Sequence, residues 1–328
     1  MNILVCGGAG YIGSHMVKSL AANSHSVVTF DNLSTGHSQA VKWGEFVEGD
    51  LLSTEALTRL FQSRQFDVVM HFSARSLVGE SVEKPALYYQ NNVVGTFNLL
   101  EAMRKHGVNR FIFSSTASIF GNPVQDKIAE DHPKAPVNPY GRTKLMVENI
   151  LQDFAHAYGL NSVSLRYFNA AGSDAAGELG EEHDPETHLI PNILRAAKGE
   201  EGACLKIFGD DYPTIDGTCI RDYIHVEDLC DAHLRAMDYL DGGASGASAF
   251  NLGNGSGFSV KQVLNAAEKV VGCEIPNQVA GRRAGDPAVL VADSSKAREQ
   301  LGWTPAYTDI EEIIATAWNW MRQGSRFR

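Results

Sequence analysis

Cysteine is scarce in this sequence, and the few cysteines are far apart. No pair of them has the Cys-x-x-Cys spacing. An odd, dispersed set is typical of reduced thiols rather than of a disulfide framework or a cysteine-rich metal site. The cysteines are Cys6, Cys204, Cys219, Cys230 and Cys273. This usage predicts a cytoplasmic protein.

Long apolar runs and excess positive charge are also missing. No apolar stretch has the length that a bilayer crossing needs, and no charged leader precedes a hydrophobic segment at the N-terminus. The 28 Lys and Arg residues are outnumbered by 39 Asp and Glu residues, which gives a formal net charge of −11. Nucleic acids and anionic membranes are bound by basic faces. We therefore expect no nucleic acid and no membrane as partner, and local arginines for any anionic ligand.

The first half of the chain alternates strand-like and helix-like segments. Short runs of Val, Ile and Phe without polar alternation are typical of strands buried on both faces of a parallel sheet. The expected strands are 2–6, 26–30, 45–47, 67–72, 110–114 and 162–166, and the expected helices are 12–22, 54–64, 87–106 and 140–158. This order predicts an α/β fold with a Rossmann-type, doubly wound parallel sheet.

The regular alternation stops after residue 166. Residues 172–187 are rich in Gly, Ala, Asp and Glu and predict a long surface loop. Further helices are expected at 188–198, 227–240, 259–271 and 309–323, with strands at 206–208 and 249–252. We therefore expect a Rossmann domain over 1–170 and a smaller mixed α/β domain over 171–328.

A glycine-rich turn follows the first expected strand. Gly7, Gly10 and Gly13 lie between the apolar run 2–6 and a helix-like segment. Glycines let the backbone approach phosphates, and the N-terminus of the next helix offers unpaired N–H groups and a positive dipole end. Tight turns use glycine for other reasons too, so the turn alone is a weak signal. Its place between strand and helix predicts a site for a dinucleotide pyrophosphate.

Asp31 ends the second expected strand, where its carboxylate would meet an adenosine ribose. A carboxylate accepts hydrogen bonds from both ribose hydroxyls of NAD and repels the 2′-phosphate of NADP. The following residues 32–37 contain no Arg or Lys to hold that phosphate. We therefore expect NAD as the cofactor; the alternative role for Asp31 is that of a turn or N-cap residue.

Tyr140 and Lys144 are one helical turn apart, so their side chains share a helix face. Asn138 is the expected N-cap and Pro139 the first helical residue. A phenol has a pKa of about 10 and is a poor base at neutral pH. A nearby ammonium, a cationic nicotinamide and the helix N-terminus can together lower that pKa. We predict Tyr140 as the catalytic base; the alternative is an ordinary amphipathic helix with an exposed lysine.

Hydroxyl groups lie at the end of the strand expected at 110–114. Ser114, Ser115 and Thr116 would stand at the carboxyl edge of a parallel sheet, where nicotinamide and substrate meet. We predict that Thr116 bridges Tyr140 and a substrate hydroxyl. The alternative is a Ser/Thr-rich turn.

Two segments carry side chains that are able to bind metal ions. His183 and His188 lie in an acidic, glycine-rich loop without the helical ligand spacing of zinc sites. Asp210, Asp211 and Asp216 do not match a calcium loop. We therefore expect no metal.

Short motifs are spread over the chain from residue 2 to about residue 303. They are 7–13, 71–72, 91–93, 114–116, 139–144, 166–169, 207–214, 221–226 and 282–287. Together they resemble the extended short-chain dehydrogenase/reductases and, among these, the UDP-hexose 4-epimerases. The combination is far more specific than any single motif.

The resemblance implies NAD-dependent epimerisation of a UDP-hexose at C4, with Thr116, Tyr140 and Lys144 as the catalytic residues. The implied cofactor-binding residues are Gly7, Gly10, Tyr11, Ile12, Gly13, Asp31, Asn32, Asp50, Leu51, Phe72, Ser73, Ala74, Asn91, Ser114, Tyr140, Lys144, Tyr167 and Phe168. The implied substrate-binding residues are Thr116, Asn169, His188, Leu189, Ile207, Phe208, Arg221, Tyr223, Arg283, Asp286 and Leu290. Relatives often form homodimers through two helices of the first domain, so a homodimer through 87–106 and 140–158 is expected.

The chain departs from the family pattern at a few positions. Phe120 stands where a tyrosine is usual, and Ser76 stands where some members have a lysine. Leu290 lies where some relatives have a tyrosine that narrows the sugar pocket. From the smaller side chain we expect that N-acetylated UDP-hexosamines fit as well.

Two other functions fit the same architecture. One is another nucleotide-sugar enzyme, either a 4,6-dehydratase, a decarboxylase or a UDP-uronate epimerase. Dehydratases of this type carry acidic residues after the threonine, whereas Thr116 is followed by Ala117 and Ser118. The other is a non-catalytic NAD-sensing protein, which has no use for the Tyr140 and Lys144 pair.

Overall fold

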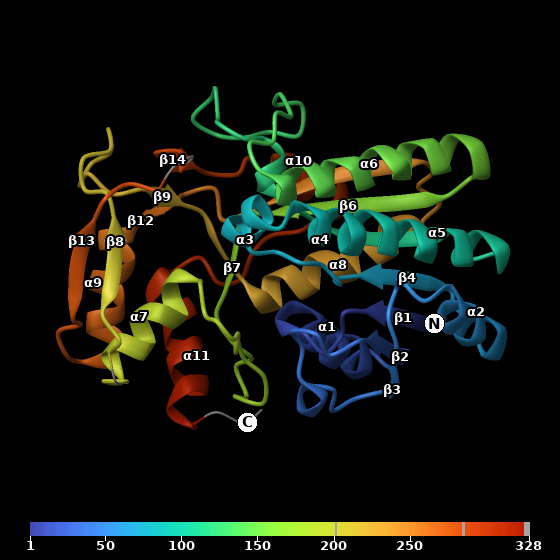
Figure 1. The fold of residues 1–328 in the computed structure, drawn as a ribbon, viewed down its shortest axis with the longest axis horizontal. Coiled ribbons are helices and arrows are strands. Elements are labelled where there is room, and N and C mark those ends of the chain that lie inside the picture. The colour runs from blue at the N-terminus through green and yellow to red at the C-terminus, as the bar shows by residue number, and fades with distance from the viewer. Residues whose placement is uncertain (201, 284–285, 325–328) are drawn as a thin grey trace.

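The computed structural model describes residues 1–200, 202–283 and 286–324 (Figure 1). Residues 284–285 of the 282–287 motif, and 325–328 at the end of the second expected domain, lie outside the described residues. Within the described ranges, no helix combines the length and the apolar character required to cross a membrane.

A parallel sheet forms the centre of the molecule, with the strand order β11-β6-β5-β4-β1-β2-β3. Its strands are β1 (Asn2–Cys6), β2 (Ser26–Asp31), β3 (Glu45–Glu48), β4 (Val68–His71), β5 (Arg110–Thr116), β6 (Asn161–Tyr167) and β11 (Ala247–Leu252). Val5 pairs with Thr29 on one side and with Met70 on the other, so β1 is central. The side chains of β4 are all buried, because helices cover both faces of the sheet. The predicted Rossmann-type fold is confirmed.

Helices pack on both faces of this sheet (Figure 1). One face carries α2 (Thr54–Ser63), α5 (Gly95–Lys105) and α6 (Pro139–Tyr158), and the other carries α1 (Tyr11–Ala22), α8 (Val226–Asp241) and α10 (Ser295–Leu301). On α6, Val147, Leu151 and Phe154 are buried at helical spacing and point into the sheet. Each such side chain contributes roughly 1.5–3 kcal/mol by leaving water.

The segment expected as one helix over 87–106 is broken into several pieces. They are the end of α4 (Pro85–Tyr88), the π-helical stretch η2 (Tyr89–Val94) and α5, and a further short helix, α3 (Val78–Glu83), precedes them. Asn92 in η2 is buried; its side chain accepts from the Arg75 N–H at 2.8 Å and donates to the Arg75 carbonyl at 2.9 Å. This tertiary contact accompanies the irregular turn, and helical periodicity gives no signal for it.

Smaller sheets and three helices form the second region, at the other end of the molecule in Figure 1. The sheets are β10-β7, β12-β9-β14 and β13-β8. Their elements are β7 (Asn169–Ala171), β8 (Leu205–Phe208), β9 (Ile220–Arg221), β10 (Tyr223–His225), β12 (Phe258–Ser259), β13 (Asn277–Ala280) and β14 (Val289–Leu290), with α7 (Leu189–Ala197), α9 (Val260–Val271) and α11 (Ile310–Arg322). Ile193, Leu264 and Ile313 join the three helices in one core. Two short 3-10 helices complete the fold, η1 (Ser38–Ala40) and η3 (Ala117–Ile119).

The chain crosses between the two regions more than once. β11 pairs with β6 in the large sheet, and Leu229 of α8, Phe250 of β11 and Trp303 lie in the same core as Ile3. α8, β11 and α10 belong to the expected second domain, 171–328, and they pack with the sheet of the expected first domain, 1–170. Local sequence predicts that 249–252 is a strand, but not which sheet it joins.

Candidate active site

The glycine-rich turn joins β1 to α1 at the carboxyl edge of the sheet. Gly7 has a φ of +82°, and a Cβ at this position would lie 2.5 Å from the Ser73 nitrogen. A Cβ on Gly13 would lie 2.1 Å from the Gly7 carbonyl oxygen. Gly10 is the N-cap of α1 and has no side chain to shield the first turn of the helix. This backbone fits a pyrophosphate, which binds to N–H groups at a helix N-terminus.

A cleft opens beside the turn. Its lining residues are Gly7, Gly10, Phe30, Asp31, Asn32, Ser34, Thr35, Gly36, Gly49, Asp50, Leu51, Phe72, Ser73, Ala74, Arg75 and Asn91. The Asp31 carboxylate accepts from the Ala9 N–H at 3.0 Å and from the Leu33 N–H at 2.9 Å. Burial raises the pKa of Asp31, and these hydrogen bonds oppose that shift. Most of the predicted cofactor-binding residues thus surround one cleft.

Some cleft residues were missed from the sequence. A Cβ on Gly36 would lie 2.7 Å from the Ala9 carbonyl carbon, so the loop after β2 packs directly against the glycine turn. The His37 N–H donates to the Ala9 carbonyl at 2.9 Å. Arg75 adds a cation to the cleft. Gly36, shortly after Asp31, could have indicated this close packing from the sequence. No sequence signal pointed to Arg75 as a cleft residue.

The first turn of α6 forms as the sequence predicts, and it places Tyr140 and Lys144 on the sheet edge. The Asn138 side chain accepts from the Gly141 N–H at 2.8 Å and caps the helix. Lys144 Nζ donates to the Ser114 carbonyl at 2.7 Å and lies 6.0 Å from the centre of the Tyr140 ring. Burial lowers the pKa of Lys144 to about 7. Because this pKa is close to neutral pH, small changes in the surroundings of Lys144 change the fraction of the amine that is protonated.

Tyr140 lies in a group of hydroxyls at the ends of β5 and β6. Thr116 and Tyr167 are register partners, and the Ser114 hydroxyl is hydrogen-bonded to the Tyr167 hydroxyl. Burial raises the pKa of Tyr140, and the Thr116 hydroxyl opposes the rise. The surrounding protein groups thus do not produce the lowered pKa that the sequence suggests, because burial outweighs the hydrogen bond to Thr116. The group is suited to carry a proton between Tyr140 and Thr116.

A buried ion pair supports this edge from below and was not predicted. Arg166 Nη2 on β6 lies 2.6 Å from Glu148 Oε2, one helical turn beyond Lys144 on α6. The Ser115 hydroxyl donates to the other Glu148 oxygen at 2.6 Å. The pair fixes α6 against β5 and β6. Buried carboxylates are seldom found without such partners.

The second region brings predicted substrate residues to the same edge. Asn169 on β7 is the register partner of Tyr223 on β10, and its side-chain amide donates to the Asp222 carbonyl at 3.0 Å. Tyr223 is buried, and burial raises the pKa of its phenol. The Asp222 carboxylate, missed from the sequence, accepts N–H groups from Asn254, Gly255 and Ala292.

Two arginines lie on neighbouring elements of this region. Arg221 Nη1 donates to the Pro287 carbonyl at 2.8 Å, and Nη2 lies 3.5 Å from the Asp286 carboxylate. Arg283 is exposed and lies over the Phe208 ring at 4.1 Å. A guanidinium group can bind phosphate oxygens through two parallel hydrogen bonds, so each of these arginines is a candidate ligand of a diphosphate.

The side chain of Ile207, a predicted substrate-binding residue, is buried in the core of the second region. Residues of β8 alternate between the core and the surface, and Ile207 is 3% exposed within the core of the second region. Its neighbour Phe208 is half-buried and carries Arg283 on its ring. Ile207 therefore stays a predicted substrate-binding residue through its backbone.

Tyr11, Ile12 and Leu189 also use their side chains for the fold. The Tyr11 hydroxyl donates to the Gly172 carbonyl at 2.7 Å, and Ile12 packs on the sheet core. Leu189 packs against the core of the second region. Tyr11 and Ile12 can therefore meet the cofactor through first-turn N–H groups of α1.

Phe168 and Leu290 lie in one apolar cluster with Phe120, Ile119 and Ile128. Leu290 is the register partner of Arg221, so this cluster adjoins that arginine. Phe120 is fully buried, and its ring meets His132 edge-on at 5.6 Å. The cluster forms an apolar wall beside Arg221.

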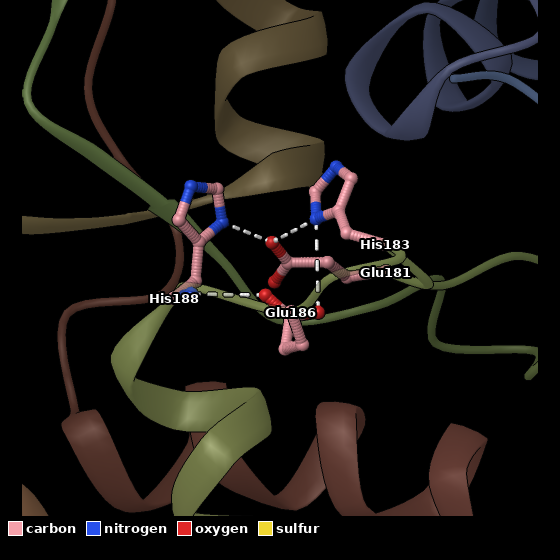
Figure 2. Close-up of side chains that lie close together, drawn as sticks. All are labelled: Glu181, His183, Glu186 and His188. Atoms are coloured by element: carbon pink, nitrogen blue, oxygen red, sulfur yellow. Dashed lines mark hydrogen bonds and ion pairs between the residues drawn. The ribbon is translucent and has the colours of Figure 1, made fainter. Parts of the chain in front are cut away.

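His188 lies beside Glu181, His183 and Glu186, which come from the loop before α7 (Figure 2). Although burial on its own would lower it, a hydrogen bond to Glu181 and the nearby Glu186 carboxylate raise the pKa of His183 to about 10. The charges of His188 and His183 lower the pKa of Glu181 to about 2, although burial on its own would raise it. These side chains meet because the loop folds back on itself, although their spacing in the sequence is not helical.

Comparison with known proteins connects this site to a family. The model of the NAD dependent epimerase/dehydratase family matches residues 3–253. A UDP-glucose 4-epimerase of Lacticaseibacillus casei is 51% identical over 321 residues, which cover 98% of this chain and 96% of that protein. The NAD complex of UDP-glucose 4-epimerase from Brucella ovis matches with a TM-score of 0.94 and 50% identity over 97% of both chains. The UDP-Glc/GlcNAc 4-epimerase of Campylobacter jejuni matches with a TM-score of 0.85 and 44% identity, over 98% of this chain and 99% of that one. The resemblance predicted from the motifs is confirmed, and the chain belongs to the NAD dependent epimerase/dehydratase family.

Proposed function

We propose that this chain is an NAD-dependent UDP-hexose 4-epimerase that interconverts UDP-glucose and UDP-galactose through a transient 4-keto sugar. One observation carries the proposal. Tyr140, Lys144 and Thr116 meet at the sheet edge next to a cleft whose backbone suits a dinucleotide. The curated relatives with this activity are about half identical to the chain over nearly its whole length.

The residues of the cleft fit NAD. Gly7 and Gly13 leave no room for side chains, so the pyrophosphate can approach the backbone of the turn. The Asp31 carboxylate, at the end of β2, would bind the adenosine ribose. NAD, when bound, accepts hydride from C4 of the sugar and returns it to the opposite face of the ring.

Tyr140 would act as the base that removes the proton of the C4 hydroxyl, directly or through Thr116. Burial raises the pKa of Tyr140, so its deprotonation needs a positive charge nearby. Lys144 Nζ, 6.0 Å from the ring centre, supplies that charge when it is protonated. The Ser114 carbonyl holds the ammonium in place and directs it along the sheet edge.

Binding of the substrate would depend on its nucleotide half. Arg221 and Arg283 would meet the diphosphate, and Asp286 orients Arg221 from 3.5 Å. The apolar wall of Phe168 and Leu290 offers the hexose few directional contacts. A sugar held mainly through its diphosphate can turn over and present either face.

The direct test is to incubate the purified protein with UDP-galactose without added cofactor and to separate the products. An epimerase yields UDP-glucose with no net consumption of NAD. A dehydratase yields a 4-keto-6-deoxy sugar, and a sensor leaves the substrate unchanged. Either of these two results would overturn the proposal, and the absorption spectrum of the protein reports the bound cofactor.

We also propose that the enzyme accepts N-acetylated UDP-hexosamines. Leu290 is partly exposed at the apolar wall, and the similar enzyme of Campylobacter jejuni is named for both UDP-Glc and GlcNAc. Leu290→Tyr should lower kcat/KM for UDP-N-acetylgalactosamine about tenfold relative to UDP-galactose, since a larger ring fills the space for the acetyl group. Leu290→Met serves as the size-matched control. An equal loss for both substrates would contradict this selectivity.

A homodimer is proposed on the surface of η2, α5 and α6. Val94, Phe97, Met146 and Tyr158 are large apolar side chains that are each more than 40% exposed on these neighbouring helices. Exposed apolar patches of this kind mark interfaces. Sedimentation should give a dimer for the parent protein and a monomer for Phe97→Asp; an unchanged mass for the variant would contradict the surface.

A cytoplasmic location is proposed from the thiols. All five cysteines are free, and Cys204 and Cys273 are exposed. Exposed free thiols persist in a reducing compartment. Cell fractionation should recover the protein with cytoplasmic markers; recovery with the envelope fraction would contradict the proposal.

A further inference from the structure

Four metal-binding side chains converge outside the cleft, at the end of the loop before α7 (Figure 2). They are Glu181, His183, Glu186 and His188, and one donor atom from each lies within 4.8 Å of all the others. Two imidazole nitrogens and two carboxylate oxygens are a donor set that suits Zn²⁺, whereas Mg²⁺ and Ca²⁺ prefer oxygen alone. We propose that these four side chains bind one Zn²⁺ ion.

The distances between the donors are close to those of a zinc site. His183 Nδ1 lies 3.2 Å from Glu181 Oε1, and His188 Nδ1 faces the same oxygen. Glu186 Oε2 lies 3.7 Å from His183 Nδ1, which is too long for a hydrogen bond. Zinc bonds of 2.0–2.1 Å place tetrahedral donors about 3.4 Å apart. Small side-chain rotations therefore suffice to receive the ion.

Burial and the surrounding hydrogen bonds also favour a cation. The side chains of Glu181 and Glu186 are only 6% and 1% exposed, and buried carboxylates require compensation. Glu186 Oε1 accepts the N–H groups of Thr187 and His188 at 2.8 and 2.9 Å, which directs Oε2 toward the cluster. Outer hydrogen bonds of this kind orient metal ligands. The half-exposed His188 ring provides a way in from solvent.

The position of the site indicates a structural role. The loop over 172–188 is tied to α1 by the Lys18–Asp174 ion pair at 2.6 Å, and it ends at His188, the N-cap of α7. An ion held by four protein donors closes its coordination shell, as structural zinc does. The bound ion would fix the connection between the large sheet and the second region. The sequence did not suggest this because all four donors come from a loop.

The test is a zinc titration of the full chain in competition with a chromogenic chelator. Cys204→Ser and Cys273→Ser are introduced first, because exposed thiols bind zinc on their own. We expect one Zn²⁺ per chain with a Kd of about 10 μM or tighter and a higher Tm in its presence. His183→Gln and Glu186→Gln should each weaken binding at least about tenfold. His156→Gln, an exposed histidine of α6, is the matched control and should leave binding unchanged.

Cobalt gives a second readout that does not depend on folding of the variants. Co²⁺ at this site should show the visible absorption of a tetrahedral nitrogen and oxygen environment, and Zn²⁺ should abolish it while Mg²⁺ does not. A Kd weaker than about 100 μM in the parent protein would overturn the proposal. Equal affinity in His183→Gln, or an equal loss in His156→Gln, would overturn it as well.

Discussion

The proposed cofactor cleft and the proposed substrate region would bind their ligands with different parts of the chain. In the cleft, backbone N–H groups near the start of the sequence would bind the pyrophosphate. Gly7 and Gly13 leave no side chain between the ligand and this backbone. In the substrate region, long side chains such as Arg221 and Arg283 extend from separate elements. Pairing of β9 with β14 brings Arg221 and Leu290 together. A site formed by backbone N–H groups depends on close packing around the glycines. A site formed by side chains depends on which distant strands pair and bring those side chains together.

The largest effect is expected when a single methyl group is added to the glycine turn, which tests whether the cleft depends on close packing of its backbone. A Cβ at Gly13 would lie 2.1 Å from the Gly7 carbonyl oxygen, so Gly13→Ala should cost about 2 kcal/mol or more in the free energy of unfolding. NAD should be lost on purification. At Gly10 the same methyl group would lie 3.5 Å from that oxygen, so Gly10→Ala should change stability by less than about 0.5 kcal/mol. Thermal unfolding and the cofactor content of both variants measure this, and equal destabilisation would contradict the role of close packing.

A matched pair of arginines sharpens the comparison on the substrate side. Arg283→Ala should raise KM for UDP-galactose about 10- to 100-fold, since a charge-assisted bond to a phosphate is worth roughly 1.5–3 kcal/mol. Arg282 is already paired with Asp211 at 2.6 Å and stacks on Tyr212. Arg282→Ala should therefore change KM less than about threefold. Steady-state kinetics decide between them, and a larger effect at Arg282 would contradict the assignment.

Buried histidines give the smallest of these effects, and it appears in acid. Burial lowers the pKa of His233 to about 4, and that of His15, His71 and His225 to about 4, 3 and 3. Between pH 6.5 and 4 the unfolded chain therefore binds more protons than the folded chain, and stability falls as the pH falls through this window. His233→Gln should reduce the slope of unfolding free energy against pH by up to about 1.4 kcal/mol per pH unit. Urea unfolding at several pH values measures the slope; an unchanged slope would contradict neutral burial of His233.

The sequence was a good guide wherever the signal is local. Residues close together in the chain determine the apolar runs of β1 to β6 and the N-cap of α6 at Asn138. They also place Tyr140 and Lys144 on one face of α6. The glycine turn and Asp31 were likewise predicted on one cleft, because strand, turn and helix follow one another directly.

The remaining features depend on contacts between distant segments. β11 joins β6 across about eighty residues, and Asn92 shapes η2 through Arg75. The Lys144 ammonium donates to the Ser114 carbonyl, a partner that the spacing between Lys144 and Tyr140 does not predict. The 181–188 loop gathers its four donors by folding back, which no periodicity reveals. Side-chain partners of this kind are fixed by tertiary packing, and local propensity is silent about them.

Tyr140→Phe tests the central claim most directly, because the change removes one hydroxyl and keeps the ring. The substitution should lower turnover of UDP-galactose about 10²- to 10⁴-fold, since it removes the group that takes the C4 proton. Affinity for UDP should stay within about twofold, because in the proposed site the nucleotide contacts the second region and not the Tyr140 hydroxyl. Full turnover in Tyr140→Phe, or a loss of UDP binding equal to the loss of turnover, would contradict the account.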